Sequence, residues 1–183
     1  MSKLVTYAGI AASVILIAFG IGSIVVGING RDRVHSDLAR EQIVGTPDST
    51  IPGQKVDTGS EAQAFANVMR KHTLEATGGQ TYAQMGRFLD AAGKPTNDEK
   101  AAAVKNGQPV ENPLRQIWVT ETALTTALNT SYFAESVATF AIVMGAALLL
   151  VGIGFLVVIV RLLVPETRRR EVAITAPAAP AAG

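Results

Sequence analysis

Two long runs without a charged side chain dominate the hydrophobic pattern of this chain. One covers residues 4–28 and the other begins at Ser136, and each holds 25 consecutive uncharged residues. A helix of that length measures about 37 Å, whereas the hydrocarbon core of a bilayer measures about 30 Å. The pattern therefore predicts two transmembrane helices, at 4–28 and at 136–164. A cleaved signal peptide fits the first run less well, because its apolar core would be about 7–15 residues long.

Between these runs, residues 29–135 alternate between amphipathic helical stretches and turns. A helix is expected to continue past residue 28 through 34–43, and the Pro- and Gly-containing segment 45–59 predicts a loop. Ser60 with Gln63 fits a capping box at the start of the next helix. This helix carries an apolar stripe at helical spacing and ends at a glycine pair. The stripe consists of Phe65, Met69 and His72, and the pair is Gly78-Gly79.

The segment after the glycine pair predicts two further short helices. Thr81 with Gln84 repeats the capping-box pattern, and Tyr82, Met85 and Leu89 follow at helical spacing. Residues 96–112 read as a polar excursion that contains a short helix, stopped by an Asn-Gly pair.

Asn112-Pro113 is a strong helix start, because Asn caps well and Pro suits the first helical position. No Gly or Pro follows before Gly145, so one long helix is expected to run from Pro113 into the second span. Its apolar positions before the span are Ile117, Trp118, Leu124 and Leu128. The predicted fold class is an all-α membrane protein, with two transmembrane helices flanking an extracytoplasmic helical domain.

The positive charges predict the orientation of the two spans. Arg161 and the triplet Arg168, Arg169 and Arg170 follow the second span, whereas residues 29–135 carry 11 Lys and Arg against 13 Asp and Glu. Because Lys and Arg gather on the cytoplasmic side, residues 1–3 and 165–183 are predicted in the cytoplasm, the latter ending in a disordered Ala/Pro tail. The predicted location is the cytoplasmic (inner) membrane. Arg31 and Arg33 run against this orientation.

Small residues recur four apart in both spans, a spacing that permits close helix approach in lipid. The candidate helix contacts are Ala18 with Gly22, Ser23 with Gly27, and Ala141 with Gly145. They could join the two spans or bind another protein, or could reflect only an Ala- and Gly-rich composition.

The candidate chemistry is sparse. The chain has no cysteine and two histidines, His35 and His72, without the spacing of a metal motif. No Asp, Glu, Lys, Arg or His lies inside either uncharged run, 4–28 or 136–160, which argues against a channel or pump, and a net charge of +1 gives no support to nucleic-acid binding. We therefore predict no catalytic residue, metal site or cofactor. His72 is interpreted as a packing residue on its stripe.

Two stretches, AQAFANVMRKHTLEATGGQTYAQM (62–85) and LNTSYFAESVATFAIVMGAALLLVGIGFLVVIV (128–160), resemble a group of small actinobacterial two-span membrane proteins. Members often carry the description "aromatic ring-opening dioxygenase". The resemblance implies the two-span layout. It does not supply the enzyme, because ring opening of that type needs an iron site of two histidines and a carboxylate on one scaffold.

These patterns favour a non-enzymatic membrane protein that acts as an interaction module. It would be an accessory subunit of a membrane complex or a self-associating scaffold, with the bilayer and a second membrane protein or a second copy as partners. The residues expected to pack are Phe65, Met69, His72, Tyr82, Met85, Leu89, Ile117, Trp118, Leu124 and Leu128. The alternatives are a metal protein or enzyme that uses His35 and His72, and an extracytoplasmic sensor of a small ligand.

Overall fold

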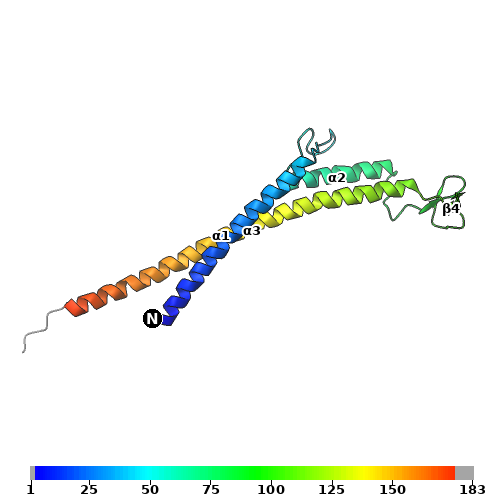
Figure 1. Cartoon of the computed structure of the whole chain (residues 1–183). Helices are drawn as coiled ribbons and strands as arrows, with labels where there is room; N and C mark the ends of the chain where they lie inside the picture. The colour runs from blue at the N-terminus through cyan, green and yellow to red at the C-terminus, as the bar shows by residue number, and fades with distance from the viewer. Residues whose placement is uncertain (1–2, 176–183) are drawn as a thin grey trace, which may run out of the picture. The chain divides into compact units, whose positions relative to one another are not determined.

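The chain folds into two compact units that share two long helices. The computed structural model describes residues 3–175, and the units comprise Met1–Asn29 with Ala138–Gly183, here the apolar unit, and Gly30–Val137, here the central unit. Helices α1 (Lys3–Arg40) and α3 (Pro113–Thr175) each contribute to both, and α2 (Gly59–Ala76) belongs to the central unit (Figure 1). The protein is mostly helical, as its sequence predicts.

The apolar unit contains only segments of α1 and α3. Both helices are long and apolar enough to cross a membrane, with mean hydropathy of 2.5 and 2.9 over their most apolar windows. Only 11% of each window is buried inside the protein, so neither helix is the enclosed core helix of a soluble fold. Most of the large apolar side chains in these windows are exposed.

Small residues seven apart hold these two helices together. Gly20 and Gly145 face each other so closely that a Cβ on either would lie 2.7 Å from the carbonyl oxygen of the other. Seven positions further along α1 and seven positions back along α3, Gly27 lies against Ala138. In the other direction, Gly152, seven positions after Gly145, lies against Ile17, three positions before Gly20. The contacts run toward opposite ends of the two helices, so the helices are antiparallel, and small residues seven apart on each helix bring them close together.

The predicted four-residue spacing is therefore only partly used. Gly27 and Gly145 are buried at the contact, Ser23 and Ala141 are half-buried, and Ala18 and Gly22 are exposed. Among the described residues, no atom lies within 4 Å of the position that a Cβ on Gly22 would take. Residues seven apart lie on nearly the same face of a helix, and that face of each helix contacts the partner helix. Ala18 and Gly22 lie on another face and are therefore not part of this contact.

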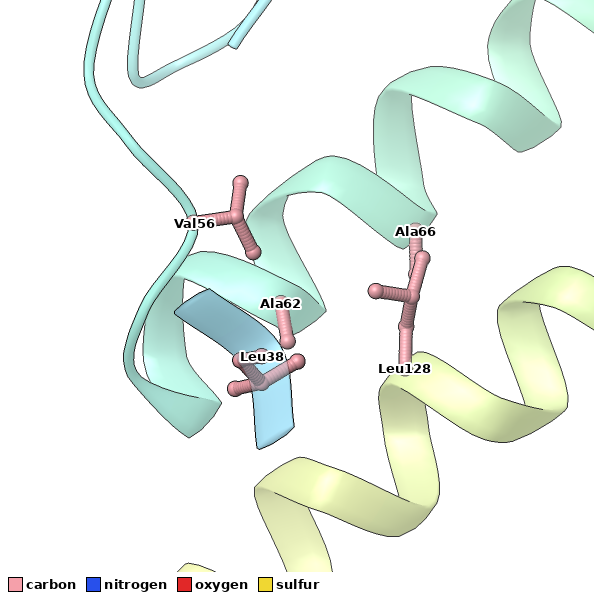
Figure 2. Close-up of a cluster of buried hydrophobic side chains, with 5 residues drawn as sticks. All are labelled: Leu38, Val56, Ala62, Ala66 and Leu128. Carbon is pink, nitrogen blue, oxygen red and sulfur yellow. The ribbon is translucent and has the colours of Figure 1, made fainter. Parts of the chain in front are cut away.

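In the central unit, α2 packs against α3 and the last turns of α1. The core joins Leu38 of α1, Val56 of the following loop, Ala62 and Ala66 of α2, and Leu128 of α3 (Figure 2). Two of the five are alanines, which lets the helices approach closely. Val34, Ile43, Ile51, Phe65 and Met69 are partly buried around this core.

Helix α2 begins two residues earlier than the sequence predicts. The cap is Thr58, whose hydroxyl accepts a hydrogen bond from the Glu61 amide at 3.4 Å, while the Glu61 carboxylate accepts from the amides of Thr58 at 2.9 Å and Asp57 at 3.0 Å. These bonds satisfy donors that a helix start leaves free. The predicted pair of Ser60 and Gln63 is wrong because Thr58 with Glu61 satisfies the same pattern and a Glu side chain accepts two amides.

After α2, the structure departs from the all-helical prediction. The helix ends at Ala76, and Gly78 and Gly79 adopt positive φ angles of 62° and 79°, as a glycine stop predicts. Residues 81–112 form no helix. They contain two antiparallel strand pairs, β1 (Phe88–Leu89) with β2 (Pro95–Thr96) and β3 (Val104–Lys105) with β4 (Gln108–Pro109).

Two local patterns explain these errors. Thr81 and Gln84 form only half of the predicted capping box: the Thr81 amide donates to the Gln84 side-chain oxygen at 2.8 Å, but the Gln84 amide donates to the Thr81 carbonyl at 3.0 Å and not to its hydroxyl, which closes a single turn. Asn106-Gly107 does not stop a helix. Both residues have positive φ, 54° and 78°, and join β3 to β4 as a two-residue hairpin turn, the geometry that Asn-Gly favours most.

Helix α3 begins where predicted and continues without a break. Asn112 caps it, with its side-chain oxygen accepting from the Leu114 amide at 3.1 Å, and Pro113 is its first residue. The helix includes Arg168, Arg169 and Arg170 and ends at Thr175. The remaining part of the predicted Ala/Pro tail, residues 176–183, lies outside the described residues.

Candidate functional site

An apolar groove crosses the central unit beside its core. The groove encloses about 520 Å³ and lies among α1, α2, α3 and the loop that follows α1. Its walls are mostly aliphatic and aromatic, and two carboxylates stand among its lining residues. The residues that line it are Asp37, Leu38, Glu41, Ile43, Phe65, Met69, Leu124, Ala127, Leu128 and Ser131.

Four of the residues that the sequence predicts to pack lie in this groove. Phe65 and Met69 come from α2, Leu124 and Leu128 from α3. Leu128 is 6% exposed and fills the core, whereas Leu124 is 49% exposed. Of these four residues, Leu128 therefore closes the core, whereas Leu124 leaves an apolar surface exposed in the groove.

Glu135, four residues after the groove residue Ser131 on α3, contacts both other helices that line the groove. Its carboxylate accepts hydrogen bonds from Arg31 Nε at 3.1 Å and lies 2.9 Å from His35 Nε2, both on α1. The same carboxylate accepts the backbone amide of Gly59, the first residue of α2. One side chain thus joins all three helices of the central unit. Gly59 permits this contact, because a Cβ there would lie 2.8 Å from the Tyr132 Cα atom.

The surroundings of Glu135 favour its charged form. Burial raises the pKa of this carboxyl, but the hydrogen bonds from His35 and Gly59 and the nearby Arg31 charge outweigh burial and hold the pKa below its usual value. The side chain is only 14% exposed. Its partner Arg31 is one of the two arginines that run against the predicted orientation, and in the structure this charge is paired.

A second carboxylate, Asp48, ties the loop after α1 to the outer face of α2. Asp48 Oδ2 lies 2.8 Å from Lys71 Nζ and 2.9 Å from His72 Nε2. Hydrogen bonds from Lys71 and His72 hold the pKa of Asp48 well below its usual range. The bond between Lys71 and Asp48 also raises the pKa of Lys71. His72 is half-buried, with 43% of its side chain exposed, and its hydrogen-bond partner is the Asp48 carboxylate of the loop after α1.

The two histidines therefore serve different contacts. His35 bonds Glu135, and His72 bonds Asp48. Within the described residues, no group of three or more His, Asp or Glu side chains could hold a metal ion. The sequence could not reveal these partners, because each carboxylate lies at least 24 positions from its histidine.

The remaining predicted packing residues lie where the first turns of α3 meet the turn region after α2. Met85 and Trp118 are buried, at 1% and 3% exposure, and the Trp118 indole donates to the Gln80 carbonyl at 3.0 Å. Leu89 is half-buried in β1, while Tyr82 and Ile117 are exposed at 43% and 38%. Ile117 lies on a helix, as its spacing predicts, whereas Tyr82 lies in a turn and Leu89 in β1, so these two share no helical stripe.

The apolar unit has a hollow of its own. It encloses about 520 Å³ and is lined by Ala18, Phe19, Gly22, Ser23, Val26 and Ala141, which include four of the predicted small contact residues. In a bilayer such a hollow needs no protein partner, because acyl chains are as apolar as its walls. Of the two apolar hollows, the groove of the central unit is therefore the better candidate for a binding site.

Comparisons with known protein families, with curated protein sequences and with solved structures find no match to this chain.

Proposed function

We propose that this protein is a non-enzymatic, two-span membrane protein whose central unit binds another protein through the apolar groove. Residues 4–28 and 136–164 would cross the cytoplasmic membrane, and residues 29–135 would lie on its outer side. The partner would be a subunit of a membrane complex or a second copy of this chain. The observation that carries the proposal is the groove, which leaves Leu124 half exposed beside Phe65 and Met69.

Exposure of the apolar groove to water is unfavourable in free energy, and a bound partner would cover that surface. Covering apolar surface stabilises a complex by roughly 25 cal/mol per Å², and aromatic and long apolar side chains in a concave site act as anchors. A helix of the partner with apolar residues on one face suits a groove built between helices. The Asp37 and Glu41 carboxylates beside the groove would favour a partner segment that carries Lys or Arg.

Two features support the proposed orientation. Gly9 of α1 lies against Ile159 of α3, which fits a hairpin whose two ends return to one side. Arg161 and the triplet 168–170 would then stand on the cytoplasmic side, as positive charges near a span end prefer.

The test is the size of the complex that the full-length protein forms in a mild detergent. We expect native-gel migration above that of a single chain. Replacing Leu124→Arg should weaken the association at least tenfold, because it places a charge in the apolar contact. Leu124 is half exposed, so the substitution leaves the core of the free chain intact.

The matched control is Ala123→Arg, which adds the same charge at an exposed neighbouring position that does not line the groove. It should leave the complex unchanged. A strictly monomeric wild-type protein would overturn the proposal, and so would a complex that both substitutions weaken equally.

A further inference from the structure

A second hollow of the central unit is lined by more polar residues than the groove and contains two arginines. It encloses about 610 Å³ between the first turns of α3 and the turn region after α2. Its walls combine charged, amide and apolar groups. The residues that line it are Tyr82, Arg87, Glu111, Asn112, Pro113, Arg115, Gln116 and Val119. Ligand sites in proteins typically measure about 300–1,000 Å³ and place a few polar groups on an apolar frame.

The two arginines in this hollow are fixed by contacts that leave their charge unpaired. The Arg115 guanidinium lies 3.9 Å from the centre of the Tyr82 ring and donates one hydrogen bond to the Met85 carbonyl at 3.0 Å. The Arg87 guanidinium lies 4.9 Å from the centre of the Phe88 ring. Stacking of this kind orders a guanidinium without neutralising it.

The backbone around Arg87 is equally well held. Its amide donates to the Asn97 side chain at 3.0 Å, and its carbonyl accepts the Asn112 amide at 2.9 Å. The Asn112 side chain donates to the Gly86 carbonyl and caps α3. The helix start itself is therefore occupied, and the charged donors among the residues that line the hollow are those of the two arginines.

In the part of the chain whose side chains the structure describes, neither Arg87 nor Arg115 has a carboxylate within ion-pairing distance. A guanidinium has five N–H donors, and only one of those on Arg115 is used by the protein. Glu111 also lines the hollow, so its formal charge is +1 from two arginines and one carboxylate. That balance suits a ligand with a single negative group better than a polyanion.

We infer that this hollow binds a small organic anion through a carboxylate or phosphate group held by Arg87 and Arg115. Guanidinium groups bind both kinds of anion with paired hydrogen bonds. The Tyr82 ring and the Val119 side chain provide apolar walls for the rest of the ligand. This site is separate from the groove, and its failure would leave the proposed protein-binding function standing.

The test uses the full-length protein in lipid nanodiscs at constant ionic strength. The probes are butyrate and butyl phosphate, with butyramide as the uncharged counterpart, and the readout is the fluorescence of Trp118, the single tryptophan of the chain, next to Val119. We expect saturable binding of at least one anion, at least tenfold tighter than butyramide. The anion that binds more tightly identifies the group that the site prefers.

The discriminating substitution is Arg87→Gln, which should weaken anion binding at least tenfold. Arg87 is exposed and its backbone contacts remain, so the variant should fold. Lys105→Gln removes an equal charge from β3 outside the hollow and should have no effect. Equal binding of anion and amide, no saturation with either anion, or unchanged binding in Arg87→Gln would each overturn the inference.

Discussion

The two units of this protein pack the same pair of helices by different means. In the apolar unit, α1 and α3 touch where side chains are missing, at Gly20, Gly27, Gly145 and Gly152. In the central unit, the helices are joined by a carboxylate, Glu135, that binds Arg31, His35 and Gly59. The first interface depends on close backbone approach, and the second adds charged hydrogen bonds to an apolar core.

The difference follows from the surroundings that each unit is suited to. Between helices in lipid there is no hydrophobic drive, so association comes from van der Waals contact, which small residues maximise. A partly buried carboxylate needs several donors to compensate for its lost water, and the central unit provides three. Two helices, α1 and α3, can therefore be joined in one unit by close contact between glycines and in the other unit by hydrogen bonds to one carboxylate.

The largest expected effect comes from filling the glycine contact. Gly20→Leu places atoms where the Gly145 carbonyl oxygen and the Leu149 amide nitrogen already lie, at 2.7 Å and 2.8 Å from a Cβ. Because both obstacles are backbone atoms, the helices must separate, and we expect a loss of about 3 kcal/mol in the free energy of unfolding. The measurement is unfolding by SDS titration in mixed micelles.

Gly22→Leu provides a matched control for that substitution. It changes the same residue type two positions away, where the described residues leave open space around the Cβ position. Both variants gain helix propensity equally, so their difference isolates the contact. If Gly22→Leu were as costly as Gly20→Leu, small residues seven apart would not explain the packing of the apolar unit.

The second effect concerns the polar cluster. Glu135→Gln removes the charge that Arg31, His35 and Gly59 share, and hydrogen bonds to a charged group contribute about 1.5–3 kcal/mol in such settings. We expect a loss of about 2 kcal/mol at neutral pH in the same unfolding measurement. Glu99→Gln, at an exposed position with no ion pair among the described residues, should change little.

The pH dependence of stability sharpens this test. The folded-state pKa of Glu135 lies below its unfolded value of 4.5, so its contribution is fully present above that value and is lost as pH falls through the folded pKa. Glu135→Gln should therefore unfold with a shallower acid dependence than wild type. The dependence should not vanish, because the pKa values of Glu61 and Asp48 are also lowered in the folded state. An unchanged acid slope would mean that Glu135 does not hold the helices together.

The large features of the fold could be read from the sequence because their signals are local and long. Charge-free runs of 25 residues predict apolar helices, and Asn112-Pro113 marks the start of α3 correctly. The glycine pair after α2 is likewise used as a stop. Each of these depends on neighbouring residues only.

The contacts between segments could not be predicted in the same way. Small residues occur on several faces of the first span, so the four-residue and seven-residue spacings were both available, and only the partner helix selects between them. Asp48, the partner of His72, is 24 positions distant from it, and the partners of Glu135 are 76 to 104 positions distant. The sequence predicts the apolar residues that line the groove but not the groove itself. The hollow with Arg87 and Arg115 depends on a turn region for which the sequence predicts helices.

The smallest expected effect separates the cap that the structure shows, Thr58, from the cap that the sequence predicts, Ser60. Thr58→Ala removes the hydroxyl that accepts the Glu61 amide, and loss of a helix cap costs about 1 kcal/mol. Ser60→Ala, at the alternative cap, should cost less than about 0.5 kcal/mol, as for an ordinary surface position. Chemical unfolding of the two variants side by side measures the difference. If Ser60→Ala were the costlier change, α2 would start two residues later, Gly59 would lie outside the helix, and its amide would no longer be the helix-start donor that completes the Glu135 cluster.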